Sequence, residues 1–336
     1  SSTTGGVWVS GATPTATIVA TSGLVNGIAP GIAGITYVLP TGCQRTTAIT
    51  VNVTPVPISG LAQVCAGATI PLTNGTPGGI WSTSATTVAL VGTSGIVTGV
   101  AAGTANISYS LPGTGCRAVK LVTVNPLPPA IGGITPLCPG NSITLTNTVA
   151  GGTWSVSGSA ATLDAATGIV TGSAPGFVIV SYTLPTGCFT ASSIVVNSLP
   201  ATISGATGIC AGATTALTNA TLGGVWVSSS PSVASVSYTG GVVTGNSAGV
   251  AYISYIIGTG CSVTHAVTVH PLPPAIGGAT SLCLGAPAAL TNAMPGGTWV
   301  SSNAAIVSVD GITGIATGYT VGGALITYTL PTGCSI

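Results

Sequence analysis

The sequence predicts an all-β protein, a tandem array of small antiparallel β-sandwiches, and three observations support this class. Val, Ile and Thr, which favour strands, dominate the composition, whereas helix formers other than Ala and Leu are scarce. Short apolar stretches are separated by turn residues drawn from 51 Gly and 23 Pro in a chain of 336 residues. The same short motifs return at one fixed period, which indicates a repeat architecture.

Five tryptophans mark the repeat period, at separations of 73, 73, 72 and 73 residues. Each Trp follows a Gly-Gly pair by two residues and precedes the Cys of a Thr-Gly-Cys motif by 34 or 35 residues. A Tyr lies six or seven residues before that Cys. Registers this consistent identify one unit in five copies. The markers are Trp8, Trp81, Trp154, Trp226 and Trp299, with Tyr37, Tyr109, Tyr182, Tyr255 and Tyr328 and with Cys43, Cys116, Cys188, Cys261 and Cys334.

Pro-rich segments separate the copies, as at Pro55-Val56-Pro57 and at 126–129 (PLPP). Proline fixes φ and favours extended backbone, so we expect short and stiff connectors. The first copy lacks its opening segment and the last stops just after its Thr-Gly-Cys, so we expect a longer parent array. The expected units are residues 1–54, 55–125, 126–197, 198–270 and 271–336.

Each complete unit is expected to contain seven short strands, and the second unit serves as the example. Ile107 and Tyr109 share one face of its sixth strand, and Val122 and Val124 point inward from its seventh. Period-two alternation with turns every 8–12 residues is typical of a β-sandwich. The expected strands are residues 58–64, 68–72, 79–83, 87–91, 96–99, 105–111 and 119–125.

A single Trp on the third strand of each unit suits an immunoglobulin-like sandwich, in which such a residue anchors the core. An alternative interpretation is a platform for sugar rings, but one Trp per unit after Gly-Gly on a strand is more often a core residue. The positions expected in the cores are therefore Trp8, Trp81, Trp154, Trp226 and Trp299.

Nine cysteines recur, two in each complete unit, with no CxxC motif and no His at metal-ligand spacing. We therefore expect disulfides rather than zinc. Two pairings are open. The within-unit alternative joins Cys65–Cys116, Cys138–Cys188, Cys210–Cys261 and Cys283–Cys334. The between-unit alternative joins Cys65–Cys188, Cys138–Cys261 and Cys210–Cys334, at spacings of 123, 123 and 124 residues.

Strand counting favours the between-unit alternative. Five expected strands separate Cys65 from Cys116, and an odd number of antiparallel strands places the two at opposite ends of the sandwich. A strand spans about 17 Å, whereas a disulfide needs Cα atoms within about 7 Å. In a head-to-tail array the opposite ends of neighbouring units face each other. Cys43, Cys116 and Cys283 would then require partners outside the chain, and the clamped joints would make the array a rod.

Charged residues make up only 1% of the chain, and there is no Glu. Three basic residues cannot neutralise a nucleic-acid backbone, and two isolated Asp cannot form a calcium site. No apolar run reaches about 18 residues, so we expect no membrane insertion. The charged residues are Arg45, Arg117, Lys120, Asp164 and Asp310.

No catalytic constellation is recognisable in the sequence. His265 and His270 occur in one unit only, on an expected final strand, and Asp164 and Asp310 are expected in turns. No Ser is matched to both a His and an acid. We therefore expect no enzyme activity, no cofactor and no metal site.

Four motifs of the second unit point to a known family: residues 64–69 (VCAGAT), 78–82 (GGIWS), 95–99 (GIVTG) and 102–109 (AGTANISY). They resemble the bacterial immunoglobulin-like group 2 (BIG2) domains, particularly the tandem versions in large surface proteins of type 9 secretion bacteria. The resemblance covers essentially the whole chain. It implies an extracellular scaffold or adhesin stalk at the bacterial cell surface. The near-absence of charge departs from typical members.

The leading functional hypothesis is a structural component of a bacterial extracellular filament or surface stalk, built as a disulfide-stiffened rod of Ig-like repeats. Its partner would be itself, through further repeats or identical subunits. A net charge of +1 removes the repulsion that normally keeps proteins apart, so self-assembly is expected. The alternative is a cell-surface adhesin whose repeats bind glycans or other surfaces.

Overall fold

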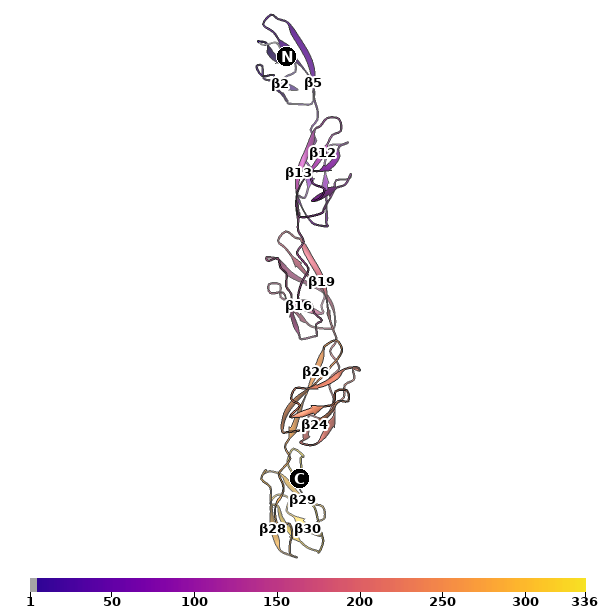
Figure 1. The fold of residues 1–336 in the computed structure, drawn as a ribbon, viewed down its shortest axis with the longest axis vertical. Helices are drawn as coiled ribbons and strands as arrows, with labels where there is room; N and C mark the ends of the chain where they lie inside the picture. The colour runs from indigo at the N-terminus through magenta and orange to yellow at the C-terminus, as the bar shows by residue number, and fades with distance from the viewer. Residues whose placement is uncertain (1–4) are drawn as a thin grey trace. The chain divides into compact units, whose positions relative to one another are not determined.

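The computed structural model describes residues 5–336, which form 32 β-strands and no helix (Figure 1). The chain is therefore all-β, as its composition predicts. Contacts between Cα atoms divide it into two compact units. One comprises the described residues up to Gly132 together with Thr146–Ser155 and Ser181–Ser192, and the other comprises Gly133–Leu145, Val156–Val180 and Ser193–Ile336. We call the five sequence units repeats one to five.

Repeat one, in the first compact unit, has one sheet of three strands and one hairpin. The sheet has the order β1-β4-β5 and is antiparallel throughout. The hairpin pairs β2 with β3. The bounds are β1 (Val7–Ser10), β2 (Ala16–Ile18), β3 (Val25–Gly27), β4 (Gly31–Val38) and β5 (Gln44–Val51).

Repeat two, also in the first compact unit, is a sandwich of two four-stranded sheets. One sheet has the order β10-β11-β8-β6 and the other β7-β13-β12-β9. In immunoglobulin lettering these are D-E-B-A and A′-G-F-C, the two layers of that fold. The bounds are β6 (Ser59–Gly60), β7 (Gln63–Cys65), β8 (Thr69–Thr73), β9 (Ile80–Thr83), β10 (Ala89–Val91), β11 (Ile96–Gly99), β12 (Gly103–Ser110) and β13 (Arg117–Asn125).

The opening strand of repeat two differs from the expectation. The single strand expected over 58–64 is instead two short strands in different sheets, β6 beside β8 and β7 parallel to β13. Gly60, at the end of β6, has a φ of +122°, a conformation that side-chain-bearing residues rarely adopt. A Cβ there would also lie 2.5 Å from the carbonyl oxygen of Pro71. The chain therefore crosses from one sheet to the other at a glycine.

Repeat three contributes residues to both compact units. Its sheets have the orders β14-β17-β16 and β15-β18-β19. The bounds are β14 (Ser142–Thr144), β15 (Thr153–Ser157), β16 (Ala161–Leu163), β17 (Ile169–Gly172), β18 (Gly176–Thr183) and β19 (Phe189–Val196).

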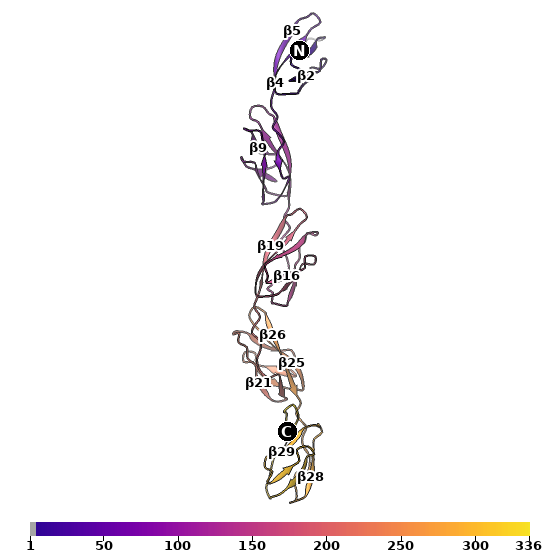
Figure 2. The ribbon, with the colours of Figure 1, turned by 180° about the vertical axis from the view of Figure 1, so that it is seen from behind.

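Repeat four, in the second compact unit, has the sheets β20-β26-β25-β22 and β21-β24-β23. Figure 2 labels β21, β25 and β26 of this repeat. Strand β20 is parallel to β26, as β7 is to β13 in repeat two. The bounds are β20 (Gly208–Cys210), β21 (Thr214–Ala216), β22 (Val225–Ser228), β23 (Ala234–Val236), β24 (Val242–Gly245), β25 (Gly249–Ile256) and β26 (Ser262–His270).

Repeat five, in the same compact unit, has the sheets β27-β28-β31-β30 and β29-β32. The second sheet has only two strands, β29 paired antiparallel with β32. The bounds are β27 (Gly277–Gly278), β28 (Pro287–Thr291), β29 (Thr298–Ser301), β30 (Val307–Val309), β31 (Ile315–Gly318) and β32 (Ile326–Thr329).

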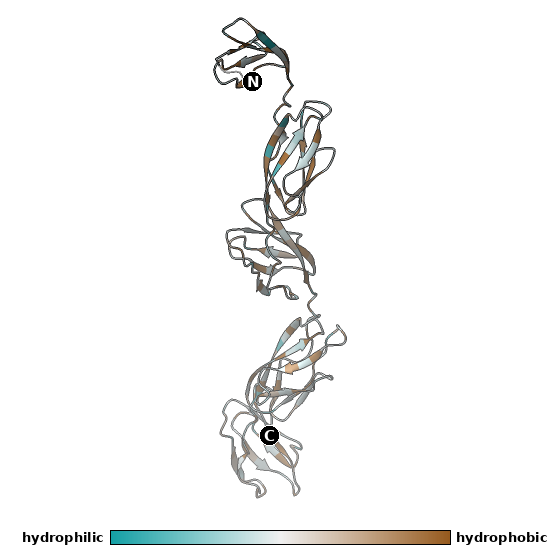
Figure 3. Cartoon of the chain, turned by 45° about the horizontal axis from the view of Figure 1, so that its top comes forward, coloured by the Kyte–Doolittle hydropathy of each residue, from teal (hydrophilic) through white to brown (hydrophobic). Residues whose placement is uncertain are grey.

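The cores of repeats two and four consist of buried apolar side chains from both of their sheets. Val97, Ile107 and Val122 are fully buried in repeat two, and their counterparts in repeat four include Ile253 and Val267. Each such side chain stabilises the fold by roughly 1.5–3 kcal/mol. Apolar and polar residues are interspersed along the strands (Figure 3), as a half-buried sheet requires. No polar or charged side chain is buried among residues 5–336.

Candidate functional site

Three disulfides join neighbouring repeats, and all lie within one compact unit or the other. They are Cys65–Cys188, Cys138–Cys261 and Cys210–Cys334, with Cα atoms 5.6, 5.7 and 5.6 Å apart. These are the three pairs of the between-unit alternative. The within-unit pairs, including Cys65–Cys116 and Cys283–Cys334, do not form in the described chain.

The strand register explains why a cysteine cannot pair within its own repeat. Cys65 ends β7 and stands opposite Asn125, the last residue of β13. Cys116 directly precedes Arg117, the first residue of the same strand. Strand β13 has nine residues, so its ends are about 30 Å apart at 3.3 Å per residue. The two cysteines of one repeat therefore lie at opposite ends of a strand.

Four of the six bonded cysteines are buried, whereas Cys65 and Cys210 are half-buried. Cys188, Cys261 and Cys334 are at most 1% exposed. Each follows a glycine in the left-handed region, for example Gly187 at a φ of +83°. Cys43 and Cys283 are unpaired and exposed, and Cys116 is unpaired and half-buried. By position, Cys43 and Cys116 belong to the F–G turn, whereas Cys283 belongs to the A′–B boundary.

Each Trp packs against the Tyr of its own repeat. The ring centroids are 4.6–4.9 Å apart in the five pairs. Trp154, Trp226 and Trp299 are buried, while Trp8 and Trp81 are half-buried and pack against their repeat's core cluster. These rings lie among core side chains, which leaves little ring face to hold a sugar.

The Tyr hydroxyl holds the turn that leads into the Trp strand. In repeat four the Tyr255 hydroxyl donates to the Thr221 carbonyl at 2.6 Å and accepts from the Gly224 N–H at 2.8 Å. A Cβ at Gly224 would lie 2.5 Å from the Tyr255 ring. Gly223, before it, has a φ of +80°. The Gly-Gly pair before each Trp is therefore required by backbone conformation at its first residue and by ring contact at its second.

An Asn after the second strand ties the Pro-rich connector to the body of its repeat. Asn147 Nδ2 donates to the Pro129 carbonyl at 2.8 Å, and its Oδ1 accepts from the Val149 N–H at 3.0 Å. No sequence expectation includes this role, although Leu-Thr-Asn returns at the repeat period. The same two bonds are made by Asn74, Asn219 and Asn292. We call this pair of hydrogen bonds the Asn clamp of each repeat.

The charged and titratable residues do not gather into a site. Lys120 Nζ donates to the Ile58 carbonyl at 3.5 Å. His265 and His270 both lie on β26, as expected for a final strand. No group of three or more His, Cys, Asp or Glu residues suited to a metal occurs in the described part of the chain. Residues 5–336 also contain no helix long and apolar enough to cross a membrane.

Both aspartates accept hydrogen bonds within a turn, as their sequence context predicts. Asp310 Oδ1 accepts from the Thr313 N–H at 2.7 Å and from the Thr313 hydroxyl at 2.8 Å. These bonds hold the pKa of Asp310 below its ordinary value. Backbone N–H bonds from Ala166 and Thr167 likewise lower the pKa of Asp164. The two carboxylates therefore act as turn acceptors.

No family model matches the chain, and no curated protein matches its sequence. Domains 4–9 of the surface layer protein SbsC are similar over 99% of this chain and 72% of that one, at 16% identity and a TM-score of 0.18. The bacterial integrin-binding protein invasin is similar over 96% and 91%, at 15% identity and a TM-score of 0.30. The human desmocollin-1 ectodomain is similar over 98% and 91%, at 9% identity and a TM-score of 0.20. The strand orders of repeats two and four themselves define a tandem immunoglobulin-like protein.

Proposed function

We propose that the chain is a structural segment of a bacterial extracellular filament or surface stalk, a disulfide-stiffened rod of BIG2-type repeats. The observation that supports this is the set of three disulfides, each joining one repeat to the next. A crosslink between consecutive domains limits how far their joint can open. When the chain is pulled, the tension passes through the disulfide rather than through the residues that it encloses. Such a design serves a mechanical role.

The cysteine chemistry supports an extracellular location. Structural disulfides persist in oxidising compartments and are rare in the cytosol. Two of the three disulfides have a buried cysteine on the F–G side of one repeat and a half-buried one on the A′–B side of another, and both cysteines of Cys138–Cys261 are buried. Each Asn clamp adds a second restraint at the connector, as Asn147 does at Pro129. Both devices recur from repeat to repeat, which is how an array is built rather than a single binding site.

Two properties of the chain support the proposed self-association. Charged residues are 1% of the chain, so few like charges keep two copies apart. Apolar side chains also stand outward from the sheets. In repeat four, Val250 and Tyr252 on β25 are 50% and 55% exposed, and both lie in the second compact unit. Exposed apolar patches commonly mark interaction surfaces, so we propose a second copy of this chain as the partner.

Electron microscopy of the purified chain over a range of concentrations tests this function. We expect filaments or laterally associated bundles whose formation changes little with salt, because few charges are involved. Isolated short particles at every concentration would contradict the proposal. Binding to a glycan array by such unassembled particles would instead favour the adhesin alternative.

A further inference from the structure

A segment of constant length joins the F–G cysteine of one repeat to the A′–B cysteine of the next. The two cysteines are 22 positions apart in all four cases. We call these segments spines one to four, and they are residues 43–65, 116–138, 188–210 and 261–283. The part of a repeat between its A′–B cysteine and its F–G cysteine is its body, such as residues 66–115 in repeat two.

A spine contains little slack. Spine four begins with the nine residues of β26, continues through the Pro-rich residues 271–274 and includes β27. Spine one likewise contains the eight residues of β5 and the short strands β6 and β7. A strand rises about 3.3 Å per residue, against about 3.5 Å for a fully stretched chain. The body of repeat two instead folds back through five strands, β8 to β12, so most of the length that tension could draw out lies in the bodies.

Each disulfide that joins two spines links the end of one to the start of the spine after next. Spines one and three therefore form one continuous covalent line, and spines two and four form another. The pairs are Cys65–Cys188 between spines one and three, Cys138–Cys261 between spines two and four, and Cys210–Cys334 between spine three and the F–G turn of repeat five.

Hydrogen bonds hold consecutive spines side by side within a repeat. In the first compact unit, β7 at the end of spine one is parallel to β13 of spine two. The N–H of Thr123 on spine two donates to the Ala62 carbonyl of spine one at 2.9 Å. In the second compact unit, β20 of spine three is parallel to β26 of spine four, and the Thr268 N–H donates to the Thr207 carbonyl at 2.8 Å. Consecutive spines belong to different covalent lines, so each ladder couples the two lines.

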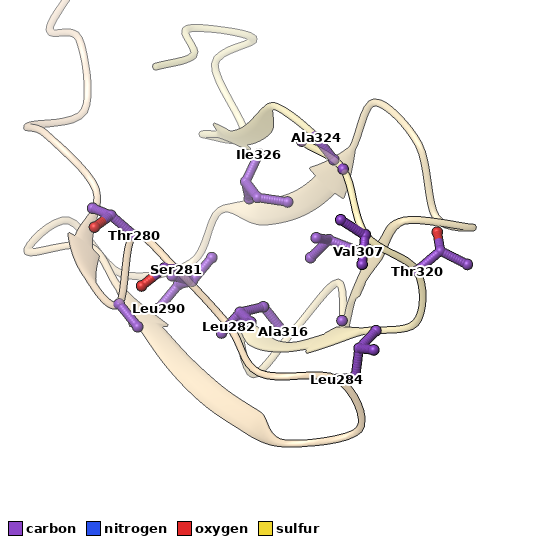
Figure 4. A pocket seen from close by; sticks show the side chains of 15 residues that line it. Thr280, Ser281, Leu282, Leu284, Leu290, Val307, Ala316, Thr320, Ala324 and Ile326 are labelled. Atoms are coloured by element: carbon purple, nitrogen blue, oxygen red, sulfur yellow. The ribbon is translucent and has the colours of Figure 1, made fainter.

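Apolar side chains fix the end of a spine to the body of the repeat that it enters. In repeat two, Ile58 and Val64 of spine one belong to the buried core. In repeat five, Ile276 and Leu282 of spine four pack against the core. Figure 4 shows Leu282 of this spine and Ala316 of the body among the residues that line one pocket. A spine can therefore carry tension while it remains packed on a folded body.

We propose that the chain bears tension on two covalent cables. Spines one and three, with Cys65–Cys188 and Cys210–Cys334, form the first cable. Spines two and four, with Cys138–Cys261, form the second. Each body runs from the end of one spine to the start of the next, so the bodies are rungs that join the two cables. A rung carries no tension while the loaded cable is closed, and its sandwich stays folded. The inference rests on the proposed mechanical function and names the covalent route that serves it.

The test uses single-molecule force spectroscopy of the full chain with two matched pairs of handles. Handles at Thr41 and Ser335 load the first cable, and handles at Thr114 and Leu284 load the second. All four residues are exposed, and each lies within two positions of the cysteine at that end of its cable. Roughly 47 residues lie on either loaded path, so both pairs should reach full extension near 17 nm at about 3.5 Å per residue. Neither trace of the wild type should show steps of domain unfolding.

Two double variants each open one cable. Cys65→Ser with Cys188→Ser opens the first, and Cys138→Ser with Cys261→Ser opens the second. Opening a cable forces the load through the rungs. We therefore expect the handles on the opened cable to reach about 53 nm for the first cable and about 43 nm for the second, with unfolding steps. The handles on the cable that remains closed should keep the wild-type length and show no such steps, which makes each variant its own control.

Unfolding steps in the wild type at either pair of handles, or a variant that lengthens at both pairs, would overturn the two-cable inference. The proposed function has a separate readout, which is filament formation in the electron microscope. A wild type that gives the expected lengths but forms no filaments would count against the filament role and leave the two cables standing.

Discussion

At the scale of single residues, the repeated sequence motifs are explained by a few contacts. The Tyr hydroxyl donates to a carbonyl and accepts from an N–H at the same time, as Tyr255 does with Thr221 and Gly224. The Gly-Gly pair leaves room for that ring and supplies the left-handed turn before it. These motifs therefore encode the fold of each repeat.

Tyr255→Phe tests the two hydrogen bonds of the Tyr255 hydroxyl against a control on the same strand. The change leaves the Gly224 N–H without its partner, so we expect repeat four to lose about 1–3 kcal/mol of stability. The control is Tyr252→Phe, because Tyr252 is 55% exposed on the other face of β25. Hydrogen exchange of β22 and β25 amides measures the difference. Equal protection of these amides from exchange in the two variants would contradict a stabilising role for the Tyr255 hydroxyl.

Acid should loosen the turn that Asp310 holds. Its folded-state pKa is lowered, so its stabilising contribution is present above the unfolded value of about 3.9 and is lost as pH falls through the folded value. An NMR titration of the Asp310 carboxyl carbon should give a midpoint below that of a model peptide. The matching turn of repeat four has Ser237 and should not respond. A midpoint at or above 3.9 would contradict the hydrogen-bonded carboxylate.

At the scale of elements, period-two alternation and Gly-containing turns predict most strands of repeat two. The expected 96–99 strand is β11, Ile96–Gly99. The opening strand could not be predicted in the same way, because its division depends on the positive φ of Gly60 and on the parallel pairing of β7 with β13. Both are tertiary features that leave no alternation in the sequence. The cysteine pairing could be predicted by counting the strands between the two cysteines of a repeat. The Asn clamp could not, because it depends on where the Pro-rich connector runs in space.

The clamp of repeat two can be removed with one change. Asn74 donates to the Val56 carbonyl and accepts from the Thr76 N–H at 2.9 Å. We expect Asn74→Ala to increase hydrogen exchange at Val56, whose own N–H is held by Thr76 at 3.0 Å, several-fold. Asn106→Ala is the control, because that exposed side chain lies on β12 and makes no such bond. Unchanged exchange at Val56 would show that the connector is held by other contacts.

At the scale of the whole molecule, the disulfides shorten the covalent path through the chain. A pull between Gly5 and Ile336 passes along the chain to Cys65 and crosses to Cys188. It then follows the chain to Cys210 and crosses to Cys334. The residues enclosed by each of these two disulfides, 66–187 and 211–333, carry no load once the crosslinks are taut. We therefore expect oxidation state, rather than domain stability, to set the extensibility of the array.

Single-molecule force spectroscopy of residues 5–336 tests this claim most directly. With disulfides intact, roughly 85 residues lie on the loaded path, so full extension should stop near 30 nm at about 3.5 Å per residue. After reduction, the same chain should extend to roughly 115 nm. Extension to the longer value under oxidising conditions would contradict the between-repeat disulfides and the mechanical role built on them.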